Sequence, residues 1–314
     1  VGNSAGAAVT TGITNTLIGG LAGDALTDAD SNVAIGYNSL SNNTVGSRSV
    51  AIGASALFTQ NPTTATDMCN VAVGDDAGKL ITTGERNTLL GKNAGDAITT
   101  GGYNSVMGQN AGTAITEGVR NVCIGDRSGV NITTGGDNIM IGANNSASAA
   151  DANNNIVMGF EVTGVGANNF TFGSTSTDSN IAFGATSITA PSDVRLKEDI
   201  QDETVGLGFI NDLRPVTFQW KKEKDIPSDM NAHVAGSEKR TMNGKHNHGF
   251  IAQEVKAVID NHNIKDGFDM WSEDETDGRQ RVGDASLMPI MVKAVQELST
   301  ALDAALARIA TLEG

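Results

Sequence analysis

Apolar and polar positions in the first half of the chain recur with a fixed period. The recurring unit is Asn-x-x-(Ile/Val/Leu/Met)-Gly, and successive copies start 17 residues apart over most of this segment. The copies start at Asn15, Asn32, Ser49, Asn70, Asn87, Asn104, Asn121, Asn138 and Asn155, and two shorter steps lead to Asn169 and Asn180. The longer step between Ser49 and Asn70 predicts a loop insertion around Asn61-Pro62. A fixed period of this kind is typical of stacked repeats.

The interior of each copy indicates β-structure. Each copy is expected to form two short strands of β-forming residues, separated by glycines that permit tight turns and positive φ angles. The same glycines would cost a helix about 1 kcal/mol each. We therefore expect a mainly β shaft over residues 1–191, about 50 Å long if ten copies each add one strand spacing.

The number of chains in one shaft is open at this point. Each copy offers three or four apolar side chains, for example Val106, Met107, Ala111 and Ile115. A single-chain solenoid could close on such a set, whereas three chains around one axis would pool their sets into a common core. We favour the trimer, because the pattern resembles the head repeats of trimeric autotransporter adhesins and the shafts of phage fibres.

The pattern changes near residue 190. Both Trp residues, all four His residues and most charged residues follow Ser192. This change predicts two domains, 1–191 and 192–314, of which the second is α+β. Near the end, apolar residues alternate at spacings of four and three: Met291, Val295, Leu298, Leu302, Ala305, Ile309 and Leu312. That spacing predicts a coiled-coil helix over about 289–314, with Pro289 near its start. A helix docked on its own domain is the alternative.

Four blocks in the second domain carry a resemblance. They are SDVRLKEDI (192–200), LRPVTFQW (213–220), HGFIAQEV (248–255) and LMPIMVKAVQEL (287–298). In this order they resemble the intramolecular chaperone domain of the endosialidase type, which closes many phage tail fibres and tailspikes. The resemblance implies a domain that trimerises, templates folding of the upstream shaft and then cuts the chain before the opening serine. It places a Ser-Lys dyad on Ser192 and Lys197, and the scissile bond at Pro191–Ser192.

The chemistry of such a dyad constrains the local backbone. A serine hydroxyl needs a base, and a lysine serves as one only when burial lowers its pKa. Residues five apart share neither a helix face nor a strand face. Ser192 and Lys197 can therefore meet only if the backbone turns between them, or if Lys197 comes from a neighbouring chain. The fixed φ of Pro191 restricts how the scissile peptide can be strained.

Other residues are candidates for supporting roles. Asp193 and Arg195 could shape the site through an ion pair or could pair at the surface. His248 could orient the scissile region or be a packed turn residue, and Gln253 and Glu254 could form hydrogen bonds there. The four histidines (His233, His246, His248 and His262) match no standard zinc spacing, so we expect neither a metal nor a cofactor.

Bulk properties limit the partners. The formal net charge of −15 argues against nucleic acid and anionic membranes, and no apolar run approaches the ~20 residues that cross a bilayer. The chain begins at Val1 rather than Met, which indicates a fragment or a trimmed product. Cys69 and Cys123 lie at different repeat phases and form no disulfide framework, which fits assembly in a reducing host cytoplasm.

Together these features predict the distal segment of a viral tail fibre or tailspike, a homotrimer in the virion. The shaft is a rigid spacer or a surface for a host glycan or protein receptor, with Tyr37, Phe58 and Tyr103 as candidate sugar contacts. One alternative is the stalk of a glycan-degrading tailspike whose active site lies upstream. Another is a bacterial trimeric surface adhesin, which should end in a membrane-anchoring β segment.

Overall fold

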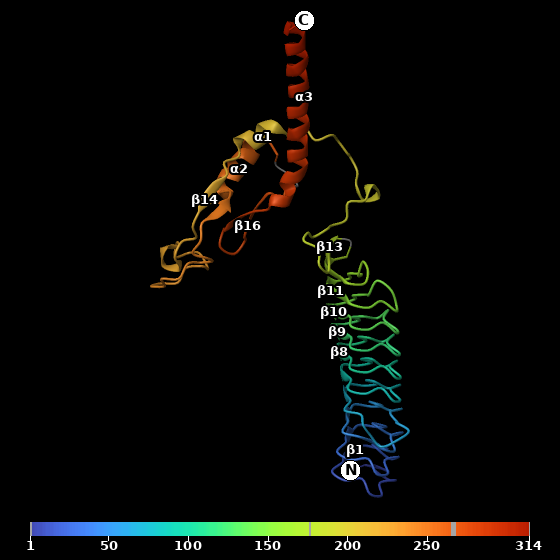
Figure 1. Cartoon of the computed structure of the whole chain (residues 1–314). Helices are drawn as coiled ribbons and strands as arrows, with labels where there is room; N and C mark the ends of the chain where they lie inside the picture. Colours follow the sequence, from blue (N-terminus) through green and yellow to red (C-terminus); the bar gives the residue numbers. More distant parts are fainter. Residues whose placement is uncertain (1, 176, 265–267, 314) are drawn as a thin grey trace. The chain divides into compact units, whose positions relative to one another are not determined.

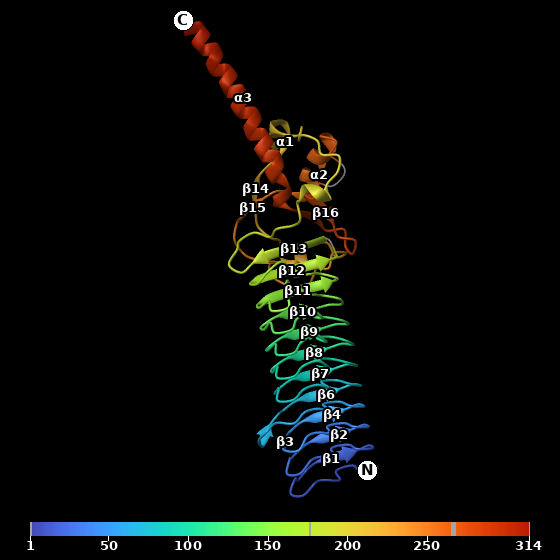
Figure 2. The ribbon, with the colours of Figure 1, turned by 90° about the vertical axis from the view of Figure 1, so that its right-hand side faces the viewer.

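The computed structural model describes residues 2–175, 177–264 and 268–313. The chain divides into two compact units, Val1–Leu196 and Lys197–Gly314 (Figure 1). In the first unit, eleven strands of the described residues form one sheet (Figure 2). They are β1 (Thr16–Ile18), β2 (Val33–Ile35), β4 (Val50–Ile52), β6 (Val71–Val73), β7 (Thr88–Leu90), β8 (Ser105–Met107), β9 (Val122–Ile124), β10 (Ile139–Ile141), β11 (Asn155–Phe160), β12 (Asn169–Ser174) and β13 (Thr177–Ala182).

Successive repeats lie directly on top of one another. From β1 to β12 the strands pair in parallel, and outside the insertion and the shorter last step the partners are 17 residues apart, as Leu89 pairs with Val106. Each copy is therefore one coil of a β-solenoid, as the period predicts. The predicted copy at Asn180 is wrong, because β13 runs antiparallel to β12 and Asn180 pairs with Thr171. Eleven residues are too few for a full coil, so the chain turns back as a hairpin.

Each coil contains one strand of the main sheet rather than the two that we expected. The second run of β-formers, such as 98–101, forms a bend instead of a strand. Its backbone still bonds to the next coil, since the Thr99 N–H donates to the Thr116 carbonyl at 2.9 Å. The four-residue insertion lies where predicted and adds a two-residue pair between β3 (Gly46–Ser47) and β5 (Thr66–Asp67).

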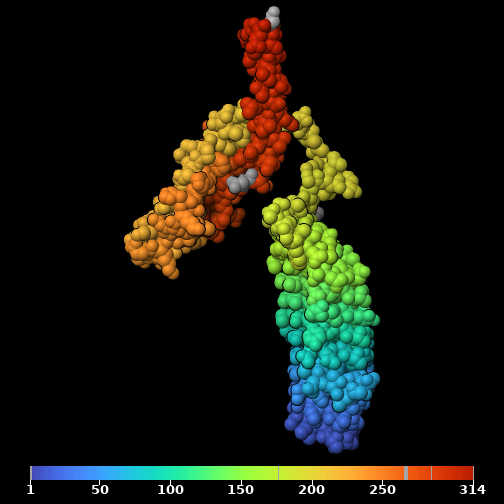
Figure 3. Space-filling view, viewed as in Figure 1, coloured from blue at the N-terminus to red at the C-terminus, as the bar shows by residue number. Residues whose placement is uncertain are grey.

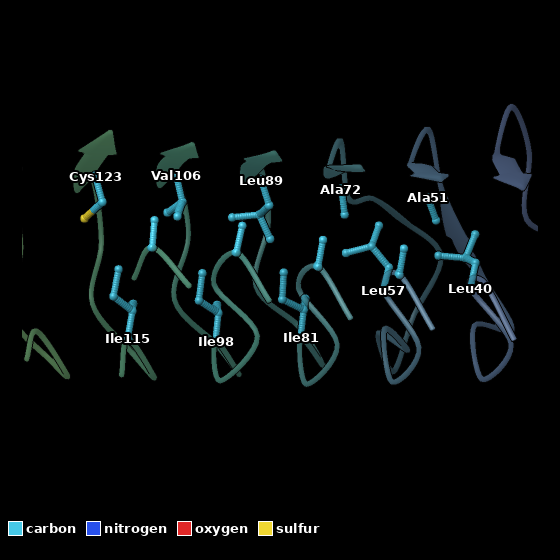
Figure 4. Packing of buried hydrophobic residues seen from close by; sticks show 14 of the residues in the cluster. Leu40, Ala51, Leu57, Ala72, Ile81, Leu89, Ile98, Val106, Ile115 and Cys123 are labelled. Atoms are coloured by element: carbon cyan, nitrogen blue, oxygen red, sulfur yellow. The ribbon is translucent and has the colours of Figure 1, made fainter. Parts of the chain in front are cut away.

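The hydrophobic core of the shaft closes within a single chain. A typical coil contributes the middle residue of its strand, a small residue after the turn and a large aliphatic residue from the opposite wall. Val106, Ala111 and Ile115 form one such set, and all three are buried. Figure 4 shows Val106 and Ile115 on opposite walls of the coil. Burying one aliphatic side chain of this size stabilises the fold by about 1.5–3 kcal/mol. A core pooled from three chains is therefore not needed to fill the solenoid, and Met107 of the expected set points outward and is 46% exposed.

The repeated asparagines form a buried ladder along one corner. Asn104 Nδ2 donates to Asn87 Oδ1 at 3.1 Å and to the Gly118 carbonyl at 2.9 Å. Its Oδ1 accepts the backbone N–H of Asn121 at 3.0 Å. The side chain thus satisfies backbone groups of neighbouring coils that would otherwise be buried without partners. This explains why asparagine recurs at the start of the repeats, with Ser49 as the exception.

A glutamine repairs the ladder where one asparagine is missing. Ser49 is too short to replace Asn, and the buried Gln60 lies beside it, with its Nε2 3.1 Å from Ser49 Oγ. Gln60 Oε1 accepts from Asn70 Nδ2 at 2.8 Å. The amide of Gln60 therefore stands where the ladder would otherwise have a gap.

Gln60→Ala should lower the free energy of unfolding by about 2–3 kcal/mol, since it leaves the buried polar groups of Ser49 and Asn70 unsatisfied. Adding Ser49→Asn to Gln60→Ala should restore most of that loss by completing the ladder. Urea unfolding followed by circular dichroism measures both, and the exposed Gln109→Ala serves as control. A double variant no more stable than Gln60→Ala would contradict this account of the ladder.

The second unit is α+β. Its elements are α1 (Leu207–Asp212), β14 (Val216–Phe218), β15 (Asn247–Gly249), α2 (Ala252–Asn261), β16 (Trp271–Glu273), β17 (Gln280–Val282), α3 (Leu287–Glu313) and the short 3-10 turns η2 (Glu223–Asp225) and η3 (Asp284–Ser286). A small core is formed by Phe209, Leu213, Val255, Ile259, Met270 and Ile290. Glu297 of α3 accepts the backbone N–H of Leu207 at 2.8 Å, which ties α3 to the start of α1.

The predicted C-terminal helix is present as α3, while its coiled-coil pairing stays a prediction. Its first turns pack on their own unit through Leu287, Ile290 and Ala294. The predicted seam is exposed instead, with Val295 at 65% and Leu302 at 58% exposure, and the last turns project from the unit (Figure 3). Among the described residues, no helix is long and apolar enough to cross a membrane.

Candidate processing site

The segment around Pro191 and Ser192 is an extended connection without a core of its own. Every residue from 182 to 204 is exposed in the single chain. A residue before proline is biased toward extended backbone, which fits the irregular path at Ala190 and Pro191. One turn of 3-10 helix, η1 (Val194–Leu196), follows Ser192 and ends just before Lys197. The backbone thus turns between the two residues of the predicted dyad.

Asp193 and Arg195 brace this turn. Asp193 Oδ1 accepts the backbone N–H of Arg195 at 2.9 Å, and Asp193 Oδ2 accepts from the Arg195 guanidinium at 2.6 Å. These side-chain hydrogen bonds lower the pKa of Asp193 and raise the pKa of Arg195. The contribution of the pair is present above the ordinary pKa of an aspartate and is lost as the pH falls through the lowered value. Because both side chains are exposed, the pair shapes the turn more than it stabilises the fold.

His248 lies on a two-stranded ladder in the second unit. It sits in β15 opposite Thr217 of β14 and is exposed. A shallow hollow around it is lined by Pro215, Val216, Thr217, Gly249 and Phe250. An imidazole beside such a hollow can accept a proton from a group that enters it, or donate a proton to that group.

Gln253 and Glu254 lie in the first turn of α2 and do different things. Gln253 is exposed. Glu254 Oε2 accepts from Arg214 Nε at 2.9 Å, and this pairing lowers the pKa of Glu254 and raises that of Arg214. Glu254 is therefore occupied in tying α2 to the segment that leads into β14. Sequence reasoning missed the role of Arg214, although the residue belongs to one of the quoted blocks.

Two further contacts were invisible in the sequence. His262 Nε2 lies 2.8 Å from Asp212 Oδ2, and the His262 ring meets the Phe209 ring edge-on. Like the contact between Glu297 and Leu207, this pair joins residues far apart in the chain, and no local motif marks it. In the described part of the chain no group of three or more His, Cys, Asp and Glu residues could hold a metal ion.

The comparison with protein families gives one result. Residues 192–264 match the family model described as chaperone of endosialidase, and the match begins at the predicted nucleophile Ser192. Neither the search of curated proteins nor the search of solved structures gave a match. Members of this family aid folding and cleave themselves, and the family is associated with trimeric assemblies. Residues 192–264 therefore form an endosialidase chaperone domain, which follows a β-solenoid shaft in this chain.

Proposed function

We propose that this chain is the distal segment of a phage tail fibre or tailspike, whose second domain trimerises, guides folding of the shaft and then cuts itself off before Ser192. The observation that carries the proposal is the order of the two parts, a β-solenoid directly followed by a chaperone domain that starts at the serine. On this proposal residues 1–191 stay in the virion. Residues 192–314 are the processing domain, which assembles with the shaft in the host cytoplasm.

The proposed reaction uses the chain as its own substrate. Ser192 Oγ attacks the Pro191 carbonyl carbon and passes its proton to the Lys197 amine, which then protonates the departing Ser192 nitrogen. An ester between Pro191 and Ser192 Oγ replaces the peptide bond. Water hydrolyses this ester and leaves a carboxylate on Pro191 and a free amine on Ser192. The nucleophile is adjacent to its target, so proximity replaces a bimolecular encounter.

Assembly would supply the burial that the proposed role of Lys197 requires. Lys197 is exposed in the single chain, and a lysine acts as a base only when it is taken out of water. Burial of the 182–204 segment between assembled chains would provide that environment. Cleavage would then follow correct assembly, and His248 in its hollow would be a candidate to orient the scissile region.

A variant of α3 tests the coupling between assembly and cleavage. Leu302→Glu combined with Ile309→Glu places charges on the exposed seam, so we expect monomeric chains and loss of cleavage. Light scattering gives the mass and a denaturing gel gives the cleaved fraction. The control, Thr300→Glu with Ala307→Glu, adds the same charges away from the seam and should change neither. Normal cleavage by a monomeric seam variant would refute the coupling.

A further inference from the structure

The shaft carries an apolar surface that its own fold does not use. In β1–β12 the residue at the centre of each repeat motif points into the core, so the residues on either side of it point outward. The outward residues on the first side are Thr16, Val33, Val50, Val71, Thr88, Ser105, Val122, Ile139, Ile156 and Phe170. Those on the second side are Ile18, Ile35, Ile52, Val73, Leu90, Met107, Ile124, Ile141, Met158 and Phe172. We call these two columns the outer strand face.

The composition of the outer strand face is not that of a solvated sheet. All ten residues of the second column are large and apolar, and neither column contains a charge. Several are well exposed, such as Ile18 at 45%, Leu90 at 42% and Met158 at 43%. A sheet face turned to water normally carries polar residues at its outward positions. Covering the outer strand face with a partner would therefore remove this apolar surface from water.

The size and border of this face are those of an interface. Ten strands at a spacing of about 4.8 Å make it about 43 Å long. Charged residues lie on both sides of it in the sequence, with Arg86 and Arg120 before the motif and Asp75 and Asp126 after it. An apolar centre with a polar rim is the usual anatomy of a protein–protein interface. Scattered exposed apolar residues do not give this arrangement.

We propose that the outer strand faces of three copies of this chain meet along a common axis, with parallel shafts and equivalent coils level with one another. The number of copies rests on the proposed function, whereas the choice of face rests on the shaft itself. A partner must present apolar columns that rise by one strand spacing over the whole length. A second copy does so by construction, because its repeat has the same period.

The long helix α3 also favours other copies of this chain as the partners of the outer strand face. The α3 seam is a second exposed apolar row, and parallel copies of the chain would cover it as a coiled coil. One set of parallel copies thus covers both rows. In this arrangement each chain keeps the closed core described above, and the outer strand faces add a separate apolar layer between chains.

Matched cysteine variants of the full chain test the choice of face. Leu90→Cys lies on the outer strand face, whereas Leu80→Cys lies beside Ile81, whose side chain enters the core from the opposite wall (Figure 4). The two leucines are similarly exposed, at 42% and 46%. Cys69 is exposed and is replaced by serine in both variants. Cys123 can stay, because burial raises the pKa of its thiol to about 12 and keeps it unreactive.

Each variant is treated under native conditions with a short bismaleimide and run on a denaturing gel, while light scattering gives the native mass. We expect a trimeric mass for both, with most Leu90→Cys chains linked in pairs and one of each three left over, and Leu80→Cys chains almost wholly unlinked. Ile124→Cys, two coils further along, repeats the test should Leu90→Cys disturb the fold.

The outcomes separate the two proposals. A trimeric mass without links at Leu90→Cys and Ile124→Cys overturns the inference and leaves the proposed function intact. Equal linking at Leu80→Cys also overturns it, because the contact would then lie elsewhere or be random. A monomeric mass with no links overturns both the interface and the trimer, and would leave the outer strand face to a ligand of another kind.

Discussion

Ser192→Ala should leave the chain whole under conditions in which the wild type separates completely into residues 1–191 and 192–314. The expected loss in cleavage rate is at least ~10³-fold, because removing the nucleophile of a covalent mechanism leaves no alternative first step. A denaturing gel with intact-mass analysis measures the two fragments and fixes the position of the cut to one residue.

Two further variants make this test more specific. Ser187→Ala removes another exposed serine of the same segment and should cleave normally. Lys197→Met keeps the length of the side chain but removes the base, so it should fail as Ser192→Ala does while still forming the same assembly. Efficient cleavage of Ser192→Ala would overturn the proposed mechanism. If the wild type itself stays whole, the domain is a chaperone without self-cleavage activity.

If the wild type is not cleaved, Pro191 is the first residue to test as the cause. Its ring fixes φ and limits how the scissile peptide can twist toward the attacking hydroxyl. If Pro191→Ala then cleaves while the wild type does not, the proline is the block. If both stay whole, the dyad itself is incomplete.

The repeated half of the fold was predictable because one physical pattern recurs many times. Asn, a central apolar residue and Gly at fixed offsets predict a coil length, a strand and a turn in every copy. What the period could not reveal is which side of the strand faces inward. Val106 and Met107 look equivalent as apolar neighbours, yet Val106 is buried and Met107 is 46% exposed. That choice is set by how the coil closes, which involves Ile115 from the opposite wall.

The replacement of one asparagine amide in the ladder shows a second limit of prediction from the sequence. Ser49 breaks the motif, and the sequence suggests only a tolerated substitution. In the structure Gln60, from the opposite wall of the same coil, supplies the missing amide. No local rule links a serine to a glutamine 11 residues later, so this kind of compensation is visible only in three dimensions.

The chaperone domain was predictable from motif order rather than from periodicity. The blocks around Ser192 and His248 located the domain, and the family match begins at the same serine. The spacing of Ser192 and Lys197 left two routes open, a turn between them or a lysine from a neighbouring chain; the single chain has a turn there, η1, and the dyad itself stays a prediction. The partners of the other polar residues were not predictable, since Arg214 and Glu254 are 40 residues apart and meet only through the fold.

Gly108→Ala should be among the most damaging single changes in the shaft. The anchor glycines follow the strands one above another, and Gly108 has a φ of 140°. A Cβ at this position would lie 2.3 Å from the backbone oxygen of Gly125 in the next coil. Neither atom belongs to a flexible side chain, so the two coils would have to move apart.

Moving the coils apart breaks more than one contact. The strand hydrogen bonds and the asparagine ladder share the same spacing between coils, so a local gap weakens both. Together with the backbone strain of a non-glycine residue at this φ, we expect a loss of about 4 kcal/mol in the free energy of unfolding. Urea unfolding of the full chain followed by circular dichroism would measure the loss.

Gly166→Ala is the matched control for Gly108→Ala. Gly166 lies in the same unit and needs no positive φ, and a Cβ added to it would meet no atom of another part of the chain within 4 Å. Its substitution should change stability by no more than about 0.5–1 kcal/mol, and could stabilise by restricting the unfolded chain. Equal stability of the two variants would mean that the glycine column is not what sets the spacing between coils. The period of the shaft would then have to rest on the asparagine ladder and the strand pairing alone.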